Sequence, residues 1–329
     1  MADDGHAGGA TDGRQVSGAA KLDLNGSNSA IQKVGSAELL GRVPSIYAAA
    51  EAKAEAIALG VIRDRFEGGR VPDHMHYHNS EHTAGVIARA RAIGVAIDMS
   101  DRDLLLLIIA AAFHDIVQHW SPEERDDGSI YRRRHAGRNE VASAYEAIEA
   151  MTGLGVDFQP EEQGIVASAI IGTIPGWDHE CATVVQPFLV EHGVVRALAL
   201  ADIGSAGMDP AMYRLDGPNL FAEENLDIME ALGRARRGGD ISEADQEAYR
   251  GRYVEWLRVQ PEFARGRREC LTNGELEGLD DSHKTRVERL FCHFDESIAA
   301  AEAAALDAET APFVQLMRQL DPRAFPDEA

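Results

Sequence analysis

The 329-residue chain lacks the features that mark secreted and membrane proteins. It has only three cysteines, which are odd in number, far apart and without paired zinc-ligand spacing, so a reduced, cytoplasmic setting is expected. No apolar run reaches the ~18 residues of a membrane span. The amino terminus has neither the basic start nor the apolar run of a secretory signal. The composition therefore predicts a cytoplasmic protein with no membrane partner.

Basic residues are also scarce, with 32 Lys and Arg against 55 Asp and Glu, for a net charge of −23. So acidic a surface repels nucleic-acid backbones, and no nucleic-acid polymer is expected as a partner. A small phosphorylated substrate held by a metal and a few arginines is compatible with it. The chain has no glycine-rich phosphate loop and no nucleophile elbow. Strand-like alternation is nearly absent, which predicts an all-α fold.

Three parts can be distinguished along the chain. Residues 1–34 are rich in Gly, Ala, Ser and Asp and are expected to form a disordered leader. Residues 35–210 are expected to form a helical core, and residues 211–329 to add helices that pack on it and shape a pocket or a homodimer contact. In this last part, helices are expected over residues 221–237, 242–258, 281–306 and 312–320.

A histidine-containing helix is predicted to begin near residue 80. Asn79 or Ser80 can cap it, and His82, Val86 and Ala90 then follow one another at four-residue steps. His82 therefore shares a face with apolar side chains and is expected to point inward.

Two further apolar segments also end in histidine or aspartate. Leu104–Phe113 is apolar without a break and predicts a fully buried helix, directly followed by His114 and Asp115. Asp202 lies on the apolar face of a helix expected over residues 194–203. Because an unpaired buried carboxylate costs several kcal/mol, these side chains and His82 are expected to converge on a metal ion. Imidazole and carboxylate ligands suit Mn, Fe, Zn, Co, Ni or Mg.

This ordered set, with Tyr-His-Asn-x-x-His at residues 77–82, resembles the HD-domain superfamily of metal-dependent phosphohydrolases. The likeness is to small bacterial HD phosphohydrolases and, more distantly, to class I cyclic-nucleotide phosphodiesterases, and it covers roughly residues 71–204. It implies an HD-type helical bundle that hydrolyses a phosphate ester of a small molecule, a nucleotide or related metabolite, with metal-activated water. It also implies that His78 protonates the leaving oxygen and that Asn79 contacts substrate. The ligands implied are His82, His114, Asp115 and Asp202.

A cluster of arginines follows the His-Asp pair. Arg134 and Arg138 are the members expected to bind a substrate phosphate, because guanidinium matches phosphate oxygens. The alternative is a surface cluster paired with carboxylates. Asn-Glu-x-x-Ser-Ala at residues 139–144 is similar to an element of small bacterial HD phosphohydrolases, which makes Glu140 a catalytic candidate near the metal-bound water. Its alternative role is that of a favourable acid in a first helical turn.

A second metal is left open. The cyclic-nucleotide phosphodiesterases carry a histidine three residues beyond the His-Asp aspartate, whereas here His119 lies four residues beyond it. His179 is one candidate for an additional ligand. His192 precedes Asp202 by ten residues, about 15 Å along a continuous helix, and cannot share its ion. Two further histidines, His74 and His76, precede the motif at residues 77–82 and are expected to be exposed in a loop.

Two other functions remain in competition with hydrolysis. A di-iron HD-type oxygenase would require additional histidine ligands. A non-catalytic nucleotide-binding HD module would not require the complete ligand set. One divalent ion and a hydrolytic reaction are therefore the primary expectation.

Overall fold

The computed structural model describes residues 46–69, 73–180, 183–186 and 192–325. Helices form most of this described chain, and the strands within it make only two short antiparallel hairpins, so the all-α prediction is confirmed. The predicted leader lies outside the described residues. None of the helices described here is both long and apolar enough to cross a membrane.

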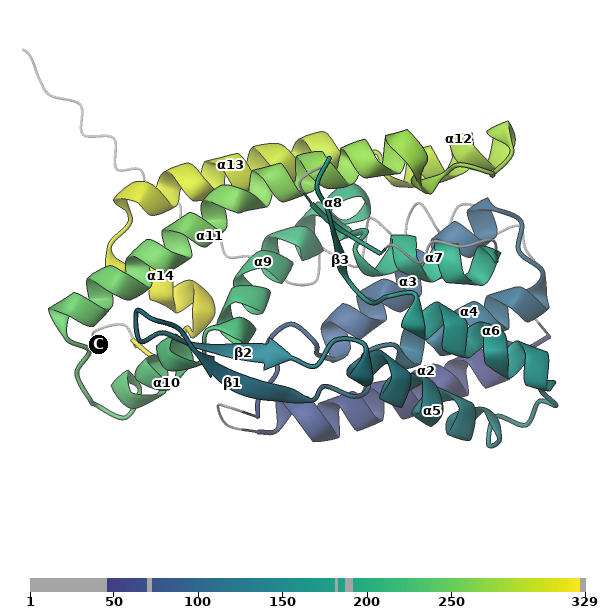
Figure 1. Cartoon of the computed structure of the whole chain (residues 1–329), viewed down its shortest axis with the longest axis horizontal. Coiled ribbons are helices and arrows are strands. Elements are labelled where there is room, and N and C mark those ends of the chain that lie inside the picture. Colours follow the sequence, from purple (N-terminus) through teal and green to yellow (C-terminus); the bar gives the residue numbers. More distant parts are fainter. Residues whose placement is uncertain (1–45, 70–72, 181–182, 187–191, 326–329) are drawn as a thin grey trace, which may run out of the picture.

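Helix α4, Asp101–Phe113, lies at the centre of the amino-terminal helices (Figure 1). Every residue from Leu104 to Phe113 is buried, as predicted, because a helix that is apolar on all sides requires neighbours on all sides. The hydroxyl of Ser100 caps α4 by accepting a hydrogen bond from the Asp103 amide at 3.0 Å. The neighbours are α2 (Ala48–Ile62), α3 (Ser80–Ala96), α5 (Arg138–Met151), α6 (Pro160–Ile171) and α7 (Gly193–Asp202), and a π-helical turn, η1 (Arg63–Glu67), extends α2.

Helices α3 and α7 pack against each other and against α4. On α3 the buried row begins at His82 and continues through Val86 and Ala90, as the four-residue spacing predicts. On α7 the buried Leu198 precedes Asp202 by about one turn. The two helices therefore present their polar residues to the carboxyl end of α4.

A hairpin of β1 (Trp120–Glu124) and β2 (Ile130–Arg134) follows the His-Asp pair. Its turn contains Gly128 with φ of 81°, a conformation that favours glycine. The Asp127 carboxylate accepts a hydrogen bond from the Ser129 amide at 2.9 Å and stabilises the turn. The hairpin places Trp120 opposite Arg134, at the end nearest α4. A second, smaller hairpin joins β3 (Gly176–Asp178) and β4 (Thr183–Val185).

The helices after residue 202 differ in extent from those expected. Pro218 and Pro261 lie inside helices rather than at their boundaries. Hydrogen bonds beside both prolines join the two helices: Trp256 Nε1 donates to the Gly217 carbonyl at 2.8 Å, and the Tyr213 hydroxyl to the Gln260 carbonyl at 2.6 Å. The elements are α8 (Ser205–Met208), α9 (Pro210–Glu224), α10 (Leu226–Ala235), α11 (Glu243–Cys270), a π-helical turn η2 (Leu271–Glu275), α12 (Asp281–Leu290), α13 (Phe294–Thr310) and α14 (Phe313–Leu320).

The long helix expected over residues 281–306 is broken between α12 and α13. At the break, the His293 amide donates to the Gly207 carbonyl at 2.9 Å. Phe291 and Phe294 stack with ring centroids 6.2 Å apart and lie against Gly207. The break therefore fastens the carboxy-terminal helices to the segment that follows α7.

Gly207→Ala tests this contact. A Cβ at Gly207 would lie 2.5 Å from Cδ1 of Phe291, so the substitution is expected to lower the free energy of unfolding by about 1–3 kcal/mol in urea titrations. Gly164→Ala in α6 is the control, because its Cβ would meet no atom within 4 Å, and stability should be unchanged or rise by up to about 1 kcal/mol. Equal stability of the two variants would contradict the packing described.

Candidate metal centre

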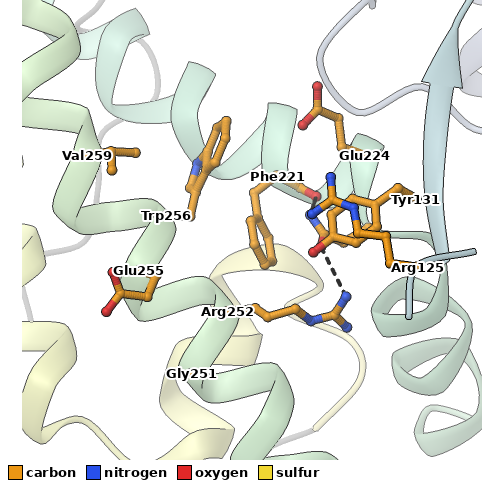
Figure 2. Close-up of a pocket in the computed structure, with 10 residues that line it drawn as sticks. Arg125, Tyr131, Phe221, Glu224, Gly251, Arg252, Glu255, Trp256 and Val259 are labelled. Carbon is orange, nitrogen blue, oxygen red and sulfur yellow. Dashed lines mark hydrogen bonds between the residues drawn. The ribbon is translucent and has the colours of Figure 1, made fainter. Parts of the chain in front are cut away.

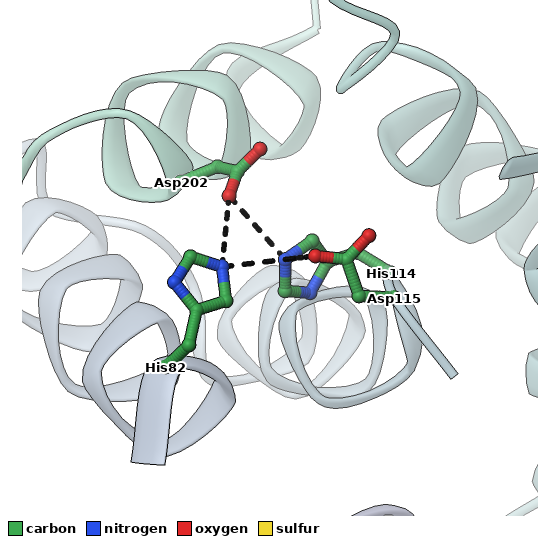
Figure 3. A group of neighbouring side chains, drawn as sticks. All are labelled: His82, His114, Asp115 and Asp202. Carbon is green, nitrogen blue, oxygen red and sulfur yellow. Dashed lines mark ion pairs between the residues drawn. The ribbon is translucent and has the colours of Figure 1, made fainter. Parts of the chain in front are cut away.

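Four side chains from three helices meet at one point inside the protein (Figure 3). His82 lies in the first turn of α3, His114 and Asp115 directly follow α4, and Asp202 is the last residue of α7. Each contributes one nitrogen or oxygen atom, and these four atoms lie within 4.8 Å of one another. Asp202 is half-buried and the others are buried. The structure thus brings together the four residues predicted as ligands.

The orientation of the imidazoles fits a cation at this point. Nδ1 of His114 is 2.8 Å from the Ala111 carbonyl, which assigns its proton to Nδ1 and leaves the Nε2 lone pair free. That Nε2 lies 3.1 Å from Asp115 Oδ2 and 3.4 Å from Asp202 Oδ1. Nε2 of His82 is 3.4 Å from the same Asp202 oxygen. Among the described residues, neither Nε2 atom has a hydrogen-bond partner. A divalent ion would satisfy both lone pairs and both carboxylates.

The charges in the group are strongly coupled. Burial alone would raise the pKa of Asp115 and of Asp202. The positive charge of His114, together with the other basic side chains nearby, outweighs burial and holds both pKa values well below the ordinary range. Burial opposes a charge on His114, yet the two carboxylates raise its pKa well above the usual value. The carboxylates therefore stay ionised and attract a positive charge. A metal ion would take the place of the proton that they otherwise hold on the imidazole.

Two buried glutamines orient the carboxylates. Gln118 Nε2 donates to Asp115 Oδ1 at 2.8 Å, and Gln186 Nε2 donates to Asp202 Oδ2 at 2.6 Å. In both aspartates the other oxygen faces the imidazoles. Hydrogen-bond donors of this kind hold a carboxylate so that its other oxygen faces the position that a metal ion would occupy. Neither glutamine could be identified from the sequence, because an isolated glutamine carries no spacing pattern.

His78 lies beside this group and is held from the carboxy-terminal part of the chain. Its Nδ1 contacts Glu223 Oε1 closely, and its amide and that of Tyr77 donate to Glu223 Oε2 at 3.0 and 2.9 Å. Nε2 of His78 is thereby directed toward the centre, 3.8 Å from Asp115 Oδ2. Burial would raise the pKa of Glu223, but His78 lowers it to about 2. Glu223 was missed because it lies in a segment without ligand spacing.

Asn79 has a structural role at the start of α3. Its side-chain oxygen accepts hydrogen bonds from the amides of Glu81 and His82, both at 2.9 Å, and its nitrogen donates to the His76 carbonyl at 2.6 Å. The amide that was expected to contact substrate is therefore already engaged within the protein. Through this cap, Asn79 positions the backbone that carries His82.

The two arginines expected at the phosphate differ in position. Arg134 donates through Nε to Gln118 at 2.9 Å, and its Nη2 lies 3.4 Å from Asp115 Oδ1. Burial opposes its charge, but Asp115 and neighbouring carboxylates raise its pKa above the ordinary value. Arg138, by contrast, begins α5 with an exposed side chain. The structure thus brings Arg134, and not Arg138, to the centre.

Glu140 is buried in the first turn of α5. One carboxylate oxygen accepts a hydrogen bond from the Gly137 amide, and the other lies 3.7 Å from Arg134 Nη2. Glu140 thus acts as a favourable acid in the first turn of a helix, the alternative that the sequence left open, and Arg134 is an additional partner. Glu140 therefore reaches the centre through Arg134.

The remaining histidines lie apart from the four ligands. His119 and His179 are exposed, and His192 caps the amino terminus of α7, at the opposite end of that helix from Asp202. The prediction that His74 and His76 are exposed is wrong, since both are half-buried and form an edge-on ring pair at 4.5 Å. Within the described residues, His82, His114, Asp115 and Asp202 form the one group with the geometry of a metal site.

No protein-family model, curated protein or solved structure matches the chain. The geometry of the centre and the motifs in the sequence are therefore the observations that bear on function.

His114→Ala tests the centre directly. Adding Mn²⁺ or Zn²⁺ to the metal-free wild type should raise its melting temperature, since ligand at a hundred times its Kd adds about 2.7 kcal/mol. For a chain of this size the shift would be at least about 2–4 °C. His114→Ala should show no shift relative to its own metal-free value, whereas the exposed His119→Ala should respond like the wild type. Equal shifts in all three proteins would exclude the centre as the binding site.

Glu223→Gln tests the contact between α9 and His78. The folded pKa of Glu223, about 2, lies below its ordinary value of 4.5, so its charge stabilises the fold above pH 4.5 and this contribution disappears as the pH falls toward 2. We expect a loss of about 2 kcal/mol in the free energy of unfolding at pH 7. In urea titrations, the difference from wild type should shrink between pH 5 and pH 3. A difference that stays constant over this range would contradict the assignment.

Proposed function

We propose that this protein is a metal-dependent phosphohydrolase of HD type that cleaves a phosphate ester of a small molecule. The proposal is supported by two features that lie side by side. His82, His114, Asp115 and Asp202 form a group that could hold a metal ion, and Nε2 of the buried His78 imidazole faces this group. The motif that contains His78 and His82 and the adjacent His114-Asp115 pair support the same chemistry. The strongly negative net charge favours a small phosphorylated metabolite over a polynucleotide.

His82, His114, Asp115 and Asp202 would hold the ion, which could be Mn, Fe, Zn, Co, Ni or Mg. When bound, a divalent ion in this setting polarises the phosphate and lowers the pKa of a coordinated water. Gln118 and Gln186 keep one oxygen of each aspartate turned inward. With one oxygen from each aspartate, these four side chains would leave a bound ion able to take water and a phosphate oxygen as well.

The reaction requires water to add to phosphorus, the bond from phosphorus to the leaving oxygen to break, and a proton to reach that oxygen. His78 is positioned to donate the proton from Nε2. Glu223 holds the opposite ring nitrogen and thereby keeps Nε2 directed toward the centre. Arg134 lies beside Asp115, where its guanidinium can bind a second phosphate oxygen. The products are an alcohol and inorganic phosphate for a monoester, or an alcohol and a phosphate monoester for a diester.

One ion per chain is proposed rather than two. A second ion would need additional ligands, and the histidines considered for this role, His119 and His179, are exposed and lie outside the group. An oxygenase with two irons is therefore not favoured. A sensor that binds a nucleotide without hydrolysis would have no use for the proton donor His78.

His78→Gln is the test of the proposed function. The variant should bind the metal as the wild type does, because His78 is not among the four ligands. Its kcat should fall by about 10²–10⁴ for alkyl phosphates, which need a proton on the leaving oxygen, and far less for p-nitrophenyl phosphate. His119→Gln serves as the matched control and should keep wild-type rates on both esters. Equal rates of His78→Gln and wild type on alkyl esters would refute the proton-donor role.

A further inference from the structure

Arg89 is the largest fully buried side chain in the described part of the chain. It lies on α3, seven residues after His82 and therefore on the same face of that helix. Its guanidinium donates to two backbone carbonyls, from Nε to Ala201 at 2.6 Å and from Nη2 to Asp202 at 3.4 Å. Ala201 and Asp202 are the last two residues of α7. Arg89 thus joins the helix that carries one metal-ligand candidate to the end of the helix that carries another.

This buried guanidinium forms no ion pair with a carboxylate among the described residues. Removing a charge from water is costly unless an opposite charge compensates it. Two other arginines show the common solution. Arg267 is buried and donates to both oxygens of Glu275. Arg252, which lines a cavity of about 510 Å³ between α9, α11 and the β1–β2 hairpin (Figure 2), is paired with Asp227 at 2.5 Å. The position of Arg89 must therefore be stabilised in another way.

The carboxyl end of α7 supplies this stabilisation. The last carbonyls of a helix have no partner within the helix and form the negative end of its dipole. Helix α7 has no basic residue of its own in its last turn. Arg89 therefore provides, from α3, the cation that this end of α7 lacks.

Gly85 leaves room for the guanidinium. It lies about one turn before Arg89 on α3, and a Cβ there would be 3.1 Å from Nη1 of Arg89. Nη1 itself has no hydrogen-bond partner among the described residues. The two bonds to α7 and the space at Gly85 therefore define where the guanidinium lies.

The charge of Arg89 also reaches Asp216, a buried residue of α9. Burial raises the pKa of the Asp216 carboxyl group, and the charges of His82 and Arg89 oppose this increase. The guanidinium and the imidazole of His82 therefore act on the same buried carboxyl group. This coupling agrees with a place for Arg89 close to the metal centre.

We propose that Arg89 is a positioning residue of the metal centre, which fixes the backbone of Asp202 relative to His82. Gln186 orients the carboxylate of Asp202, whereas Arg89 determines where its main chain lies. The contact thereby controls the separation of His82 Nε2 and Asp202 Oδ1, which are 3.4 Å apart. The proposal rests on the metal centre of the proposed function, but not on the reaction at that centre.

Arg89→Met is the test, because methionine keeps an apolar stem and removes every donor. Binding of Mn²⁺ to the metal-free protein is measured by calorimetry, at a temperature at which each variant is folded. We expect the dissociation constant to rise about 10–100-fold, the usual effect of losing a residue that orients metal ligands. Arg89→Lys should recover part of this loss, because an ammonium group can still donate to the carbonyls of α7.

Arg91→Met is the matched control. Arg91 lies on the same helix, and its ion pairs go to Glu51 and Glu55 of α2. The variant therefore removes a tertiary contact of α3 without changing the contact with α7. It should bind Mn²⁺ like the wild type, even where urea titrations show a lower free energy of unfolding. Equal weakening in Arg91→Met and Arg89→Met would mean that any loosening of α3 lowers the affinity, which overturns the proposal.

Gly85→Val is a second variant that decides the question if Arg89→Met does not fold. The added side chain would displace the guanidinium from the carbonyls while all of its donors remain present. We expect Mn²⁺ to bind about tenfold more weakly. Gly60→Val, at a glycine of α2 whose Cβ would meet no atom within 4 Å, introduces the same β-branched residue into a helix and should keep the wild-type affinity.

The results separate this proposal from the proposed function. Wild-type affinity for Mn²⁺ in Arg89→Met or, where that variant does not fold, in Gly85→Val overturns the role of Arg89 and leaves hydrolysis standing. Weakened binding in these variants, with a wild type that hydrolyses no phosphate ester, overturns the proposed function and supports the positioning role. A wild type that binds no divalent ion overturns both.

Discussion

Two ionised carboxylates and two imidazole lone pairs face each other in a region from which the fold excludes most water. Removing such groups from water costs several kcal/mol for each charge unless a partner compensates it. A proton on His114 adds a single positive charge and so balances only one of the two carboxylates. A bound cation would resolve the conflict, and the surrounding helices bring its four candidate ligands together.

The fold serves this centre from both halves of the chain. Helix α4 is buried on all sides and therefore gives His114 and Asp115 a rigid starting point. Helices α3 and α7 bring one ligand each to its end. Helix α9, from the carboxy-terminal part, adds Glu223 and fixes the direction of His78. The carboxy-terminal part of the chain thus completes the centre through Glu223.

The sequence could predict the parts of the structure that depend on local pattern. The apolar run of α4, the inward face of α3 and the apolar face of α7 each follow from helical periodicity, and together they indicated all four metal-ligand candidates. Gln118, Gln186 and Glu223 could not be found this way, since their roles arise only from contacts made in three dimensions. The exposure of Arg138 was missed for the same reason. The internal position of Pro218 was also missed, because a tertiary hydrogen bond from Trp256 stabilises a helix that the local sequence disfavours.

Anomalous X-ray diffraction from crystals grown with Mn²⁺ or Zn²⁺ is the most direct test of the metal centre. We expect one peak, at about 2.0–2.2 Å from Nε2 of His82, Nε2 of His114 and one carboxylate oxygen of each aspartate. Crystals without a peak there, in which His114 Nε2 instead donates a hydrogen bond to Asp115 or Asp202, would contradict it.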